Sequence, residues 1–235
     1  AIGSSFETPT TTELANPDGS GGFNQSLRPQ TAVNYEIGFK SGTEKLYYEI
    51  AVFHIDLDDE LVPYELPDSP GRTFYINAGK STRNGIETAV SWNTSNGFGI
   101  DASLTWSDFR FDRFIDENGR DFSGSRLPGV PEYFAFLSFN YDNDTGFTAT
   151  FETFYSGSLF ANNSNSVKVP DYLVSSLRAS YEIRTAKLLL RPYVGINNLF
   201  NEKYNSNIRI NAFGGRYYEP APERNRYAGI VIRYQ

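Results

Sequence analysis

Residues 133–142 read Tyr-Phe-Ala-Phe-Leu-Ser-Phe-Asn-Tyr-Asp, and this stretch decides the fold. Apolar residues occupy every second position from Tyr133 to Tyr141, and the later positions between them are Ser138, Asn140 and Asp142. Successive side chains of a strand point to opposite faces, so this period predicts a β-strand with one apolar face. An aromatic ring stands at each end of that face, which is where amphipathic rings lie at the two interfaces of a membrane.

The same alternation recurs along the chain, and no convincing run follows the helical period. Aromatic residues make up 16% of the sequence, and aromatic and β-branched side chains favour strands. The pattern therefore predicts an all-β, antiparallel protein with ten strands. Their expected ranges are 2–6, 31–40, 46–57, 73–94, 98–111, 131–142, 147–158, 171–184, 187–204 and 223–235.

The connections between these strands alternate strictly between short and long. Short turns are expected at 41–45, 95–97, 143–146 and 185–186, and long polar segments at 7–28, 58–72, 112–129, 161–170 and 205–222. Transmembrane β-barrels of bacterial outer membranes have this asymmetry, with short periplasmic turns and long outer loops. A soluble β-sandwich is the alternative for alternating strands, but it has no reason to obey this order.

Composition agrees with a membrane barrel once the strand pattern is taken into account. The mean hydropathy of −0.45 would ordinarily suggest a soluble protein. A membrane-spanning strand needs only about ten residues with alternate positions apolar, so turns, loops and half of each strand can be polar. The formal charge of −7 gives no basic footprint for nucleic acid, and the absence of cysteine excludes disulfides and thiolate metal sites.

The first predicted strand is a stub of about six residues with no strand before it. An unpaired sheet edge is costly in hydrocarbon because its backbone groups find no hydrogen-bond partner. We therefore expect residues 1–235 to be part of a larger barrel whose earlier strands are supplied by other sequence.

Five segments resemble the C-terminal part of the β-barrel of TonB-dependent outer-membrane receptors, in the correct order and over nearly the whole chain. The clearest is Asn197-Asn198-Leu199-Phe200-Asn201-Glu202-Lys203-Tyr204, which is similar to the family's Asn-Leu-Phe-Asp-x-x-Tyr segment. The others are residues 6–14 (Pro-Thr-x-x-Glu-Leu), 27–38 (Leu-x-Pro-Glu and Tyr-Glu-x-Gly), 77–87 (Asn-x-Gly and Gly-x-Glu) and 127–132 (Pro-x-x-Pro). The family usually ends on an aromatic residue, whereas Gln235 follows Tyr234 here.

The resemblance implies a transmembrane barrel of about 22 strands that holds a plug, a class in which the lumen is filled. Residues 1–235 would supply about ten C-terminal strands, with the N-terminal plug and the earlier strands absent. It implies a bacterial outer-membrane protein that contacts lipid and takes up a ferric siderophore or a similar scarce chelate, driven by the TonB complex acting on the missing plug. Transport of cobalamin, a carbohydrate or another metal complex by the same architecture, and a passive porin-like barrel, are the alternatives.

Candidate ligand contacts must lie in the long loops. Guanidinium and phenol groups suit an anionic, oxygen-rich chelate, and they crowd two loops: Arg113, Arg120 and Arg126 in one, and Arg209, Arg216, Tyr217 and Tyr218 in the other. The simpler interpretation of any one of them is an ion pair with an acid of the same loops, namely Asp112, Asp116, Glu117, Asp121, Glu219 or Glu223.

Catalysis is not expected. His54 is the only histidine, so no nucleophile, base and acid set can be assembled around it. The carboxylates of Asp56, Asp58, Asp59 and Glu60 lack the spacing of a calcium loop and are interpreted as a solvated acidic turn. The sequence therefore predicts no metal site in the protein and no cofactor.

Overall fold

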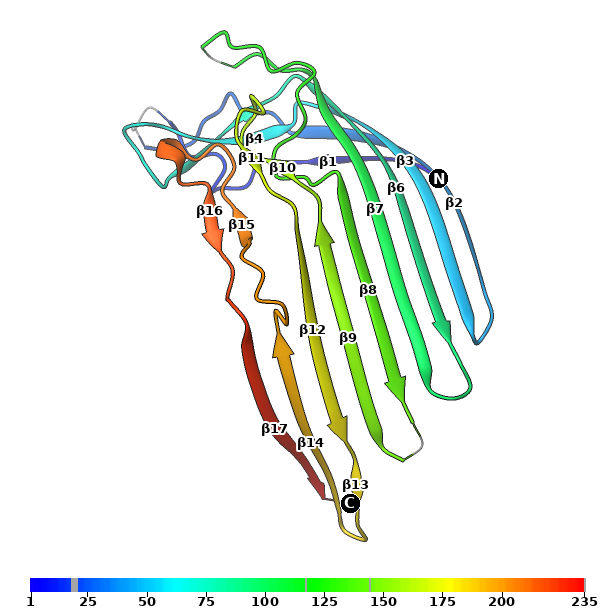
Figure 1. Ribbon diagram of the computed structural model, residues 1–235. Helices are drawn as coiled ribbons and strands as arrows, with labels where there is room; N and C mark the ends of the chain where they lie inside the picture. The colour runs from blue at the N-terminus through cyan, green and yellow to red at the C-terminus, as the bar shows by residue number, and fades with distance from the viewer. Residues whose placement is uncertain (18–20, 117, 144, 235) are drawn as a thin grey trace.

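The computed structural model of the chain describes residues 1–17, 21–116, 118–143 and 145–234. Its main feature is one antiparallel sheet, which Figure 1 shows as a curved row of strands joined by tight turns at one end and by long loops at the other. Ten long strands form this sheet, and we call them the wall. They are β1 Ile2–Glu7, β2 Gln30–Gly42, β3 Leu46–Asp58, β6 Lys80–Asn93, β7 Phe98–Arg113, β8 Tyr133–Asp142, β9 Phe147–Ser156, β12 Tyr172–Tyr181, β14 Leu188–Asn197 and β17 Asn225–Tyr234. The short β13, Ile183–Arg184, extends β12 along β14.

The long connections gather over one end of the wall (Figure 1). We call the described residues of 59–79, 114–132, 157–171 and 198–224 the loop head. It contains three two-stranded ribbons and one short helix: β4 Leu61–Glu65 with β5 Thr73–Asn77, β10 Leu159–Phe160 with β11 Lys168–Val169, β15 Asn205–Ile208 with β16 Tyr218–Pro220, and η1 Phe213–Gly215. The predicted alternation of short turns and long loops is thus what the structure shows.

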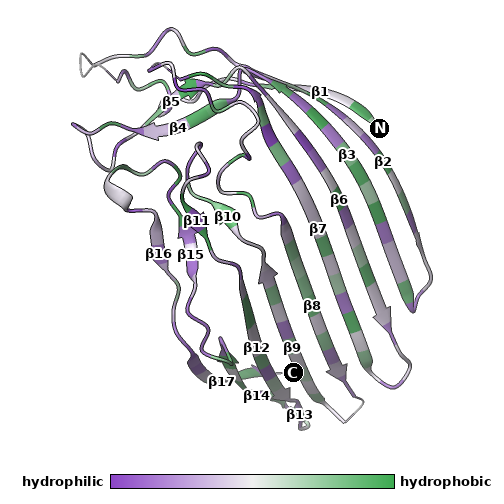
Figure 2. Cartoon of the chain, turned by 45° about the horizontal axis from the view of Figure 1, so that its top comes forward, coloured by the Kyte–Doolittle hydropathy of each residue, from purple (hydrophilic) through white to green (hydrophobic). Residues whose placement is uncertain are grey.

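The register of the wall gathers its apolar side chains on one face. Leu104 of β7 pairs with Ala135 of β8, and Ile100 pairs with Phe139, so their side chains share that face. Many of these side chains are exposed in the isolated chain: Phe139 is 45% exposed and Ile37 is 76% exposed. Figure 2 shows the resulting mixture of apolar and polar residues along each strand. Such a band is what the lipid-facing surface of a barrel requires.

The opposite face of the wall is the lumen face, and it carries polar side chains. Glu87 pairs with Thr105 of β7, which shares a face with Asp101, and with Ala51 of β3. Glu36 lies on the same face because it pairs with Phe53, two residues after Ala51. Asp101 of β7 pairs with Ser138 of β8, which in turn pairs with Glu152 of β9. The Asn140 side-chain amide donates to the Asp101 carboxylate over 2.9 Å. Alternating faces therefore make a polar interior in the manner of transporter barrels.

Two predicted strands are longer than the strands observed. Residues 73–94 form two strands, because the chain turns at Ala78 and Gly79: β5 pairs with β4 in the head, and β6 continues in the wall. A Cβ at Gly79 would lie 2.4 Å from the carbonyl oxygen of Arg113, so this close passage needs glycine. The strand predicted over 187–204 ends at Asn197, because Asn198 has a φ of 51° and binds Glu202 through its side chain.

The strand at each lateral edge of the sheet is hydrogen-bonded to one neighbouring strand. Within the described ranges, β1 pairs with β2 alone and β17 pairs with β14 alone. No helix in the described part of the chain is long and apolar enough to cross a bilayer. Gln235 lies outside the described residues, so its place after the last aromatic residue is known from the sequence only.

The buried core lies where the loop head meets the outer end of β7. It consists of Val62, Ala78, Phe111, Phe114 and Leu127, with Ile76, Phe109, Phe122 and Val130 packed against it. Phe111 and Phe114 are 1% and 2% exposed, and their ring centroids are 5.0 Å apart. This core fixes the loops relative to the wall and so positions the cavity described next.

Candidate ligand-binding site

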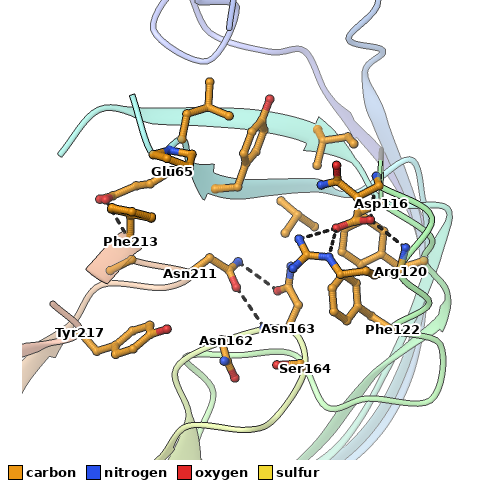
Figure 3. A pocket seen from close by; sticks show the side chains of 18 of the residues that line it. Glu65, Asp116, Arg120, Phe122, Asn162, Asn163, Ser164, Asn211, Phe213 and Tyr217 are labelled. Atoms are coloured by element: carbon orange, nitrogen blue, oxygen red, sulfur yellow. Dashed lines mark hydrogen bonds and ion pairs between the residues drawn. The ribbon is translucent and has the colours of Figure 1, made fainter. Parts of the chain in front are cut away.

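A cavity of about 610 Å³ opens among four segments of the loop head. The β4–β5 ribbon, residues 114–122, residues 162–164 and residues 211–217 each contribute to its lining. Figure 3 shows Asp116, Arg120 and Phe122 on one side and Phe213 and Tyr217 on the other. Its volume lies in the range of sites that enclose a small molecule.

Apolar side chains of the head core form part of the cavity lining. Val62 and Ile76 come from β4 and β5, where they are direct register partners. Phe114 and Phe122 come from the next loop, and their ring centroids lie 5.3 Å apart. All four residues also belong to the core of the head or pack against it, so the floor of the cavity is the surface of that core. An apolar surface of this kind can hold hydrocarbon or ring portions of a ligand.

The Glu65 carboxylate joins two loops that are far apart in the sequence. It accepts hydrogen bonds from Arg209 Nη2 at 2.9 Å and Arg216 Nη2 at 3.4 Å. The backbone N–H groups of Phe213 and Gly71 also donate to it, over 3.2 and 3.3 Å. Its side chain is only 3% exposed, so this carboxylate is satisfied by four donors rather than by water.

The Asn211 amide connects its own loop to the β4–β5 ribbon and to a third loop, residues 157–171. Its Nδ2 donates to the Pro63 carbonyl over 2.8 Å and to Asn163 Oδ1 over 3.1 Å, while its Oδ1 accepts from the Asn163 backbone N–H over 3.0 Å. Asn211 has a φ of 54°, a conformation that asparagine tolerates better than most residues. Glu65 and Asn211 together hold the cavity walls in place.

On the other side of the cavity, Asp116 fixes Arg120. Arg120 Nε and Nη2 lie 2.7 and 2.6 Å from Asp116 Oδ2, and Oδ1 accepts from the backbone N–H groups of Asn118 and Arg120. Burial raises the pKa of the Asp116 carboxyl, but the hydrogen bonds from Arg120 and Asn118 outweigh that effect and hold the pKa below its usual value. The carboxylate is therefore charged at neutral pH.

The structure brings together four of the seven predicted ligand residues. Arg120 and Tyr217 line the cavity, and Arg209 and Arg216 bind Glu65 at its edge. Tyr218 is exposed beside Tyr217, with ring centroids 6.2 Å apart, but it does not line the cavity. Arg113 and Arg126 also lie off the lining.

The expected pairing of arginines with acids of their own loops holds in part. Arg120 pairs with Asp116 as expected, and Arg126 pairs with Glu132 at 2.7 Å and approaches Asp108 at 3.8 Å. Arg209 and Arg216 instead pair with Glu65 in another loop. For Arg113, no ion pair is found with any described residue. Glu117 lies outside the described residues.

Sequence reasoning missed Glu65, Asn163, Asn211 and Phe114. A single glutamate or asparagine in a polar loop carries no local signal of its distant partners. Phe114 and Phe122 gave a weak signal, because large apolar residues inside a polar loop favour burial.

The cavity offers hydrogen bonds and apolar contact, and the described residues contain no group of three or more metal-ligating side chains. His54 lies on β3, outside this cavity, where its Nδ1 is 2.7 Å from Asn84 Oδ1 and its Nε2 is 3.3 Å from Asp56 Oδ2. The arrangement suits reversible binding of a small molecule.

An antiparallel wall with an apolar outer face, short turns at one end and a cavity-bearing loop head at the other defines a segment of a transmembrane β-barrel. Residues 1–199 match the family described as TonB dependent receptor-like, beta-barrel, and the chain belongs to this family. The predicted resemblance and the all-β barrel class are therefore confirmed.

Curated relatives and a solved structure agree with this assignment. The chain is 25% identical over 187 residues to the ferrioxamine receptor of Yersinia enterocolitica, a match covering 76% of this chain and 24% of the relative. It is 28% identical over 171 residues to the ferrichrome receptor FcuA of the same organism, covering 72% and 21%. The crystal structure of the siderophore receptor PiuA from Acinetobacter baumannii superposes with a TM-score of 0.75 at 21% identity, covering 100% of this chain and 33% of that one. The chain thus spans about a quarter of the length of these curated relatives.

Proposed function

We propose that residues 1–235 are the C-terminal portion of the barrel of a bacterial outer-membrane receptor that takes up a ferric siderophore or a similar scarce chelate. The observation that carries this proposal is the cavity of the loop head, built on a ten-stranded wall of the TonB-dependent receptor family. Relatives named as receptors for ferrioxamine and ferrichrome support the class of ligand.

The rest of the receptor is proposed to supply a plug and about twelve earlier strands, which would close a barrel of about 22 strands around a filled lumen. Two observations support this. The wall has a single-partnered strand at each lateral edge, and such edges are costly in hydrocarbon. The match also covers only 24% of the ferrioxamine receptor and 21% of the ferrichrome receptor.

In the proposed mechanism, the ligand enters the head cavity from outside the cell. Glu65 and Asn211 keep the cavity walls assembled before the ligand arrives, so little ordering entropy is lost on binding. The TonB complex then acts on the plug to open a path past the polar lumen face of the wall, while the outer face contacts lipid. No bond of the ligand is broken, and the protein supplies no resident cofactor.

Uptake of radioactive iron as a siderophore complex tests this proposal in cells whose only receptor for the complex is this one. We expect saturable uptake that stops when the TonB complex is deleted. The Tyr217→Ala/Arg120→Ala double variant should bind less ligand, whereas Arg113→Ala, which lies off the cavity lining, should behave as the unchanged receptor.

Uptake that is linear in ligand concentration and independent of TonB would contradict active transport and support a passive porin-like barrel. Saturable, TonB-dependent uptake of cobalamin, a carbohydrate or another metal complex, and not of the siderophore, would contradict the proposed ligand class. It would be consistent with the proposed receptor architecture.

A further inference from the structure

The lumen face of the wall carries polar side chains, but three phenylalanines lie side by side on it near the loop head. Phe134 and Phe136 belong to β8, where they pair with Thr105 and Ser103 of β7, so both lie on the lumen face. Phe154 of β9 is the register partner of Phe136. Its ring centroid lies 4.9 Å from that of Phe136 and 6.4 Å from that of Phe134. We call these three rings the lumen patch.

The lumen patch is exposed in this part of the receptor. Phe134 is 43% exposed and Phe154 is 41% exposed, and neither lines the head cavity. The other exposed aromatic rings on this face of the described wall, Tyr47 and Tyr227, carry a hydroxyl group that can bond water. Phenylalanine rings have no such group, and leaving a cluster of them in water costs free energy in proportion to its apolar area.

A carboxylate without an ion pair borders the lumen patch. Glu152 lies two residues before Phe154 on the same face of β9, and its register partners on both sides are serines. Among the described residues, no salt bridge to Glu152 is found. Arg178, a diagonal neighbour on β12, instead lies over the Tyr193 ring, 5.4 Å from its centroid. A group that covers the patch would also remove Glu152 from water, so a positive charge on that group would offset the cost.

The proposed plug is the occupant that fits this position. The matched regions cover only 24% of the ferrioxamine receptor and 21% of the ferrichrome receptor, so most of the length of those proteins lies outside them. A ligand would pass the lumen face only during uptake. A plug that fills the lumen would cover the rings at all times, which their exposure in water favours.

We propose that the lumen patch and Glu152 dock a segment of the plug in which apolar side chains flank a lysine or an arginine. The inference rests on the proposed function for the plug itself, and it adds the place on the wall that holds the plug and the chemistry of the docked segment. Burial of the three rings stabilises the contact, and the ion pair with Glu152 fixes its register.

Photocrosslinking in the complete receptor tests this docking site. Phe154 is replaced by benzoylphenylalanine, and the receptor is irradiated in outer membranes without an added iron complex. We expect the peptide that contains position 154 to be lost at its unmodified mass and recovered joined to a peptide from upstream of residue 1. The same replacement at Phe134 is an independent second position. The matched control is Phe151, which lies in the same strand on the lipid face as the register partner of Phe139 and should not form this crosslink.

Several outcomes would overturn the docking site. These are a crosslink from position 154 to lipid or to a separate protein, a crosslink that forms only after an iron complex is added, and no crosslink at either position. Uptake of radioactive iron by the unchanged receptor separates the two proposals. Saturable, TonB-dependent uptake without the crosslink would overturn the docking site alone, whereas the crosslink together with linear, TonB-independent uptake would contradict active transport alone.

Glu152→Lys tests the charge of the docked segment. In the receptor with the photoreactive residue at position 154, this substitution should lower the crosslinking yield several-fold, because two positive charges would then repel each other, and Glu152→Gln should lower it less. The control is Ser91→Lys, which adds a positive charge to the lumen face of β6, away from the patch, and should keep the yield. An unchanged yield in Glu152→Lys, or an equal loss in Ser91→Lys, would overturn the inference.

Discussion

The wall and the loop head contain the same types of apolar residue, but the wall exposes them on its outer face and the head buries them in a core. Phe139 in the wall is 45% exposed on the outward face, whereas Phe114 in the head is 2% exposed within a small core. In the proposed outer-membrane receptor, backbone ladders and the lipid around its outer face would stabilise the wall, because hydrocarbon solvates an apolar side chain as well as a protein core does. The head stands in water, so its apolar residues must be buried. If the wall lies in lipid as proposed, the two regions fold in different solvents, and we expect substitutions to affect them differently.

The largest expected effect is local to the head. Replacing Phe114 with alanine should lower the free energy of opening the head by about 3–5 kcal/mol, the cost of truncating a buried phenylalanine. Amide hydrogen exchange should speed up over residues 59–79 and 114–130 and stay unchanged in β8 and β9. Phe139→Ala is the matched control and should leave the head protected. Equal loss of protection in head and wall would show that they are one cooperative unit.

The next largest expected effect is a difference in stability between substitutions on the lipid face and on the lumen face of the wall. Ala102 and Ser103 are consecutive residues of β7, with Ala102 on the lipid face and Ser103 on the lumen face. Arginine at position 102 should reduce the free energy of unfolding in bilayers by about 2–4 kcal/mol, because its charge enters hydrocarbon. Arginine at position 103 should cost much less, since the lumen is polar. Denaturant titration of the folded receptor measures both, and equal costs would contradict the assigned faces.

A smaller effect is expected from the buried carboxylate that joins the head loops. Glu65→Ala removes the shared acceptor of Arg209, Arg216 and two backbone N–H groups. We expect a loss of about 1–3 kcal/mol in loop-head stability, the cost of leaving such groups unsatisfied. Proteolysis between residues 205 and 220 on intact cells should become faster. Glu219 is an exposed acid of the 198–224 loop whose carboxylate accepts a hydrogen bond from the Asn207 side chain, and Glu219→Ala should cleave as the unchanged receptor does.

The smallest effect is a pH dependence confined to the head. The pKa of Asp116 is lowered in the folded protein, so its contribution is fully present above the ordinary aspartate pKa and is lost as pH falls through the lowered value. Hydrogen exchange of residues 114–122 should therefore be constant from neutral pH to about pH 5, after correction for intrinsic rates, and should rise in acid below about pH 4. Asp116→Asn should remove this rise. A transition near neutral pH would point to another group.

Much of the wall could be predicted from the sequence, because a period of two residues is a local signal. The alternation in 133–142 and 98–106 identified both strands and the faces of their side chains, and the order of short and long connections gave the topology. Two strand ends were wrong where the chain leaves the wall, at Ala78–Gly79 and at Asn198. Gly79 passes close to the Arg113 carbonyl oxygen, and the Asn198 side chain bonds Glu202 and Pro222, and a period of two residues reveals neither arrangement.

The candidate site could be predicted only in part. Sequence reasoning placed ligand contacts in the outer loops and named Arg120 and Tyr217, but it could not assign Glu65 to Arg209, which lies 144 positions further along the chain.

The sequence by itself determined the all-β class, the two faces of each strand, the orientation of turns and loops, and the family. Hydrophobic period and connection length indicate the fold properties because both are read from local stretches of sequence, and the family was indicated by the resemblance of five short segments. The tertiary structure alone decided which loops meet and which arginines pair with a carboxylate of another loop. Those properties depend on distances between residues remote in sequence, and electrostatic compensation is fixed only when folding brings the partners within a few ångströms.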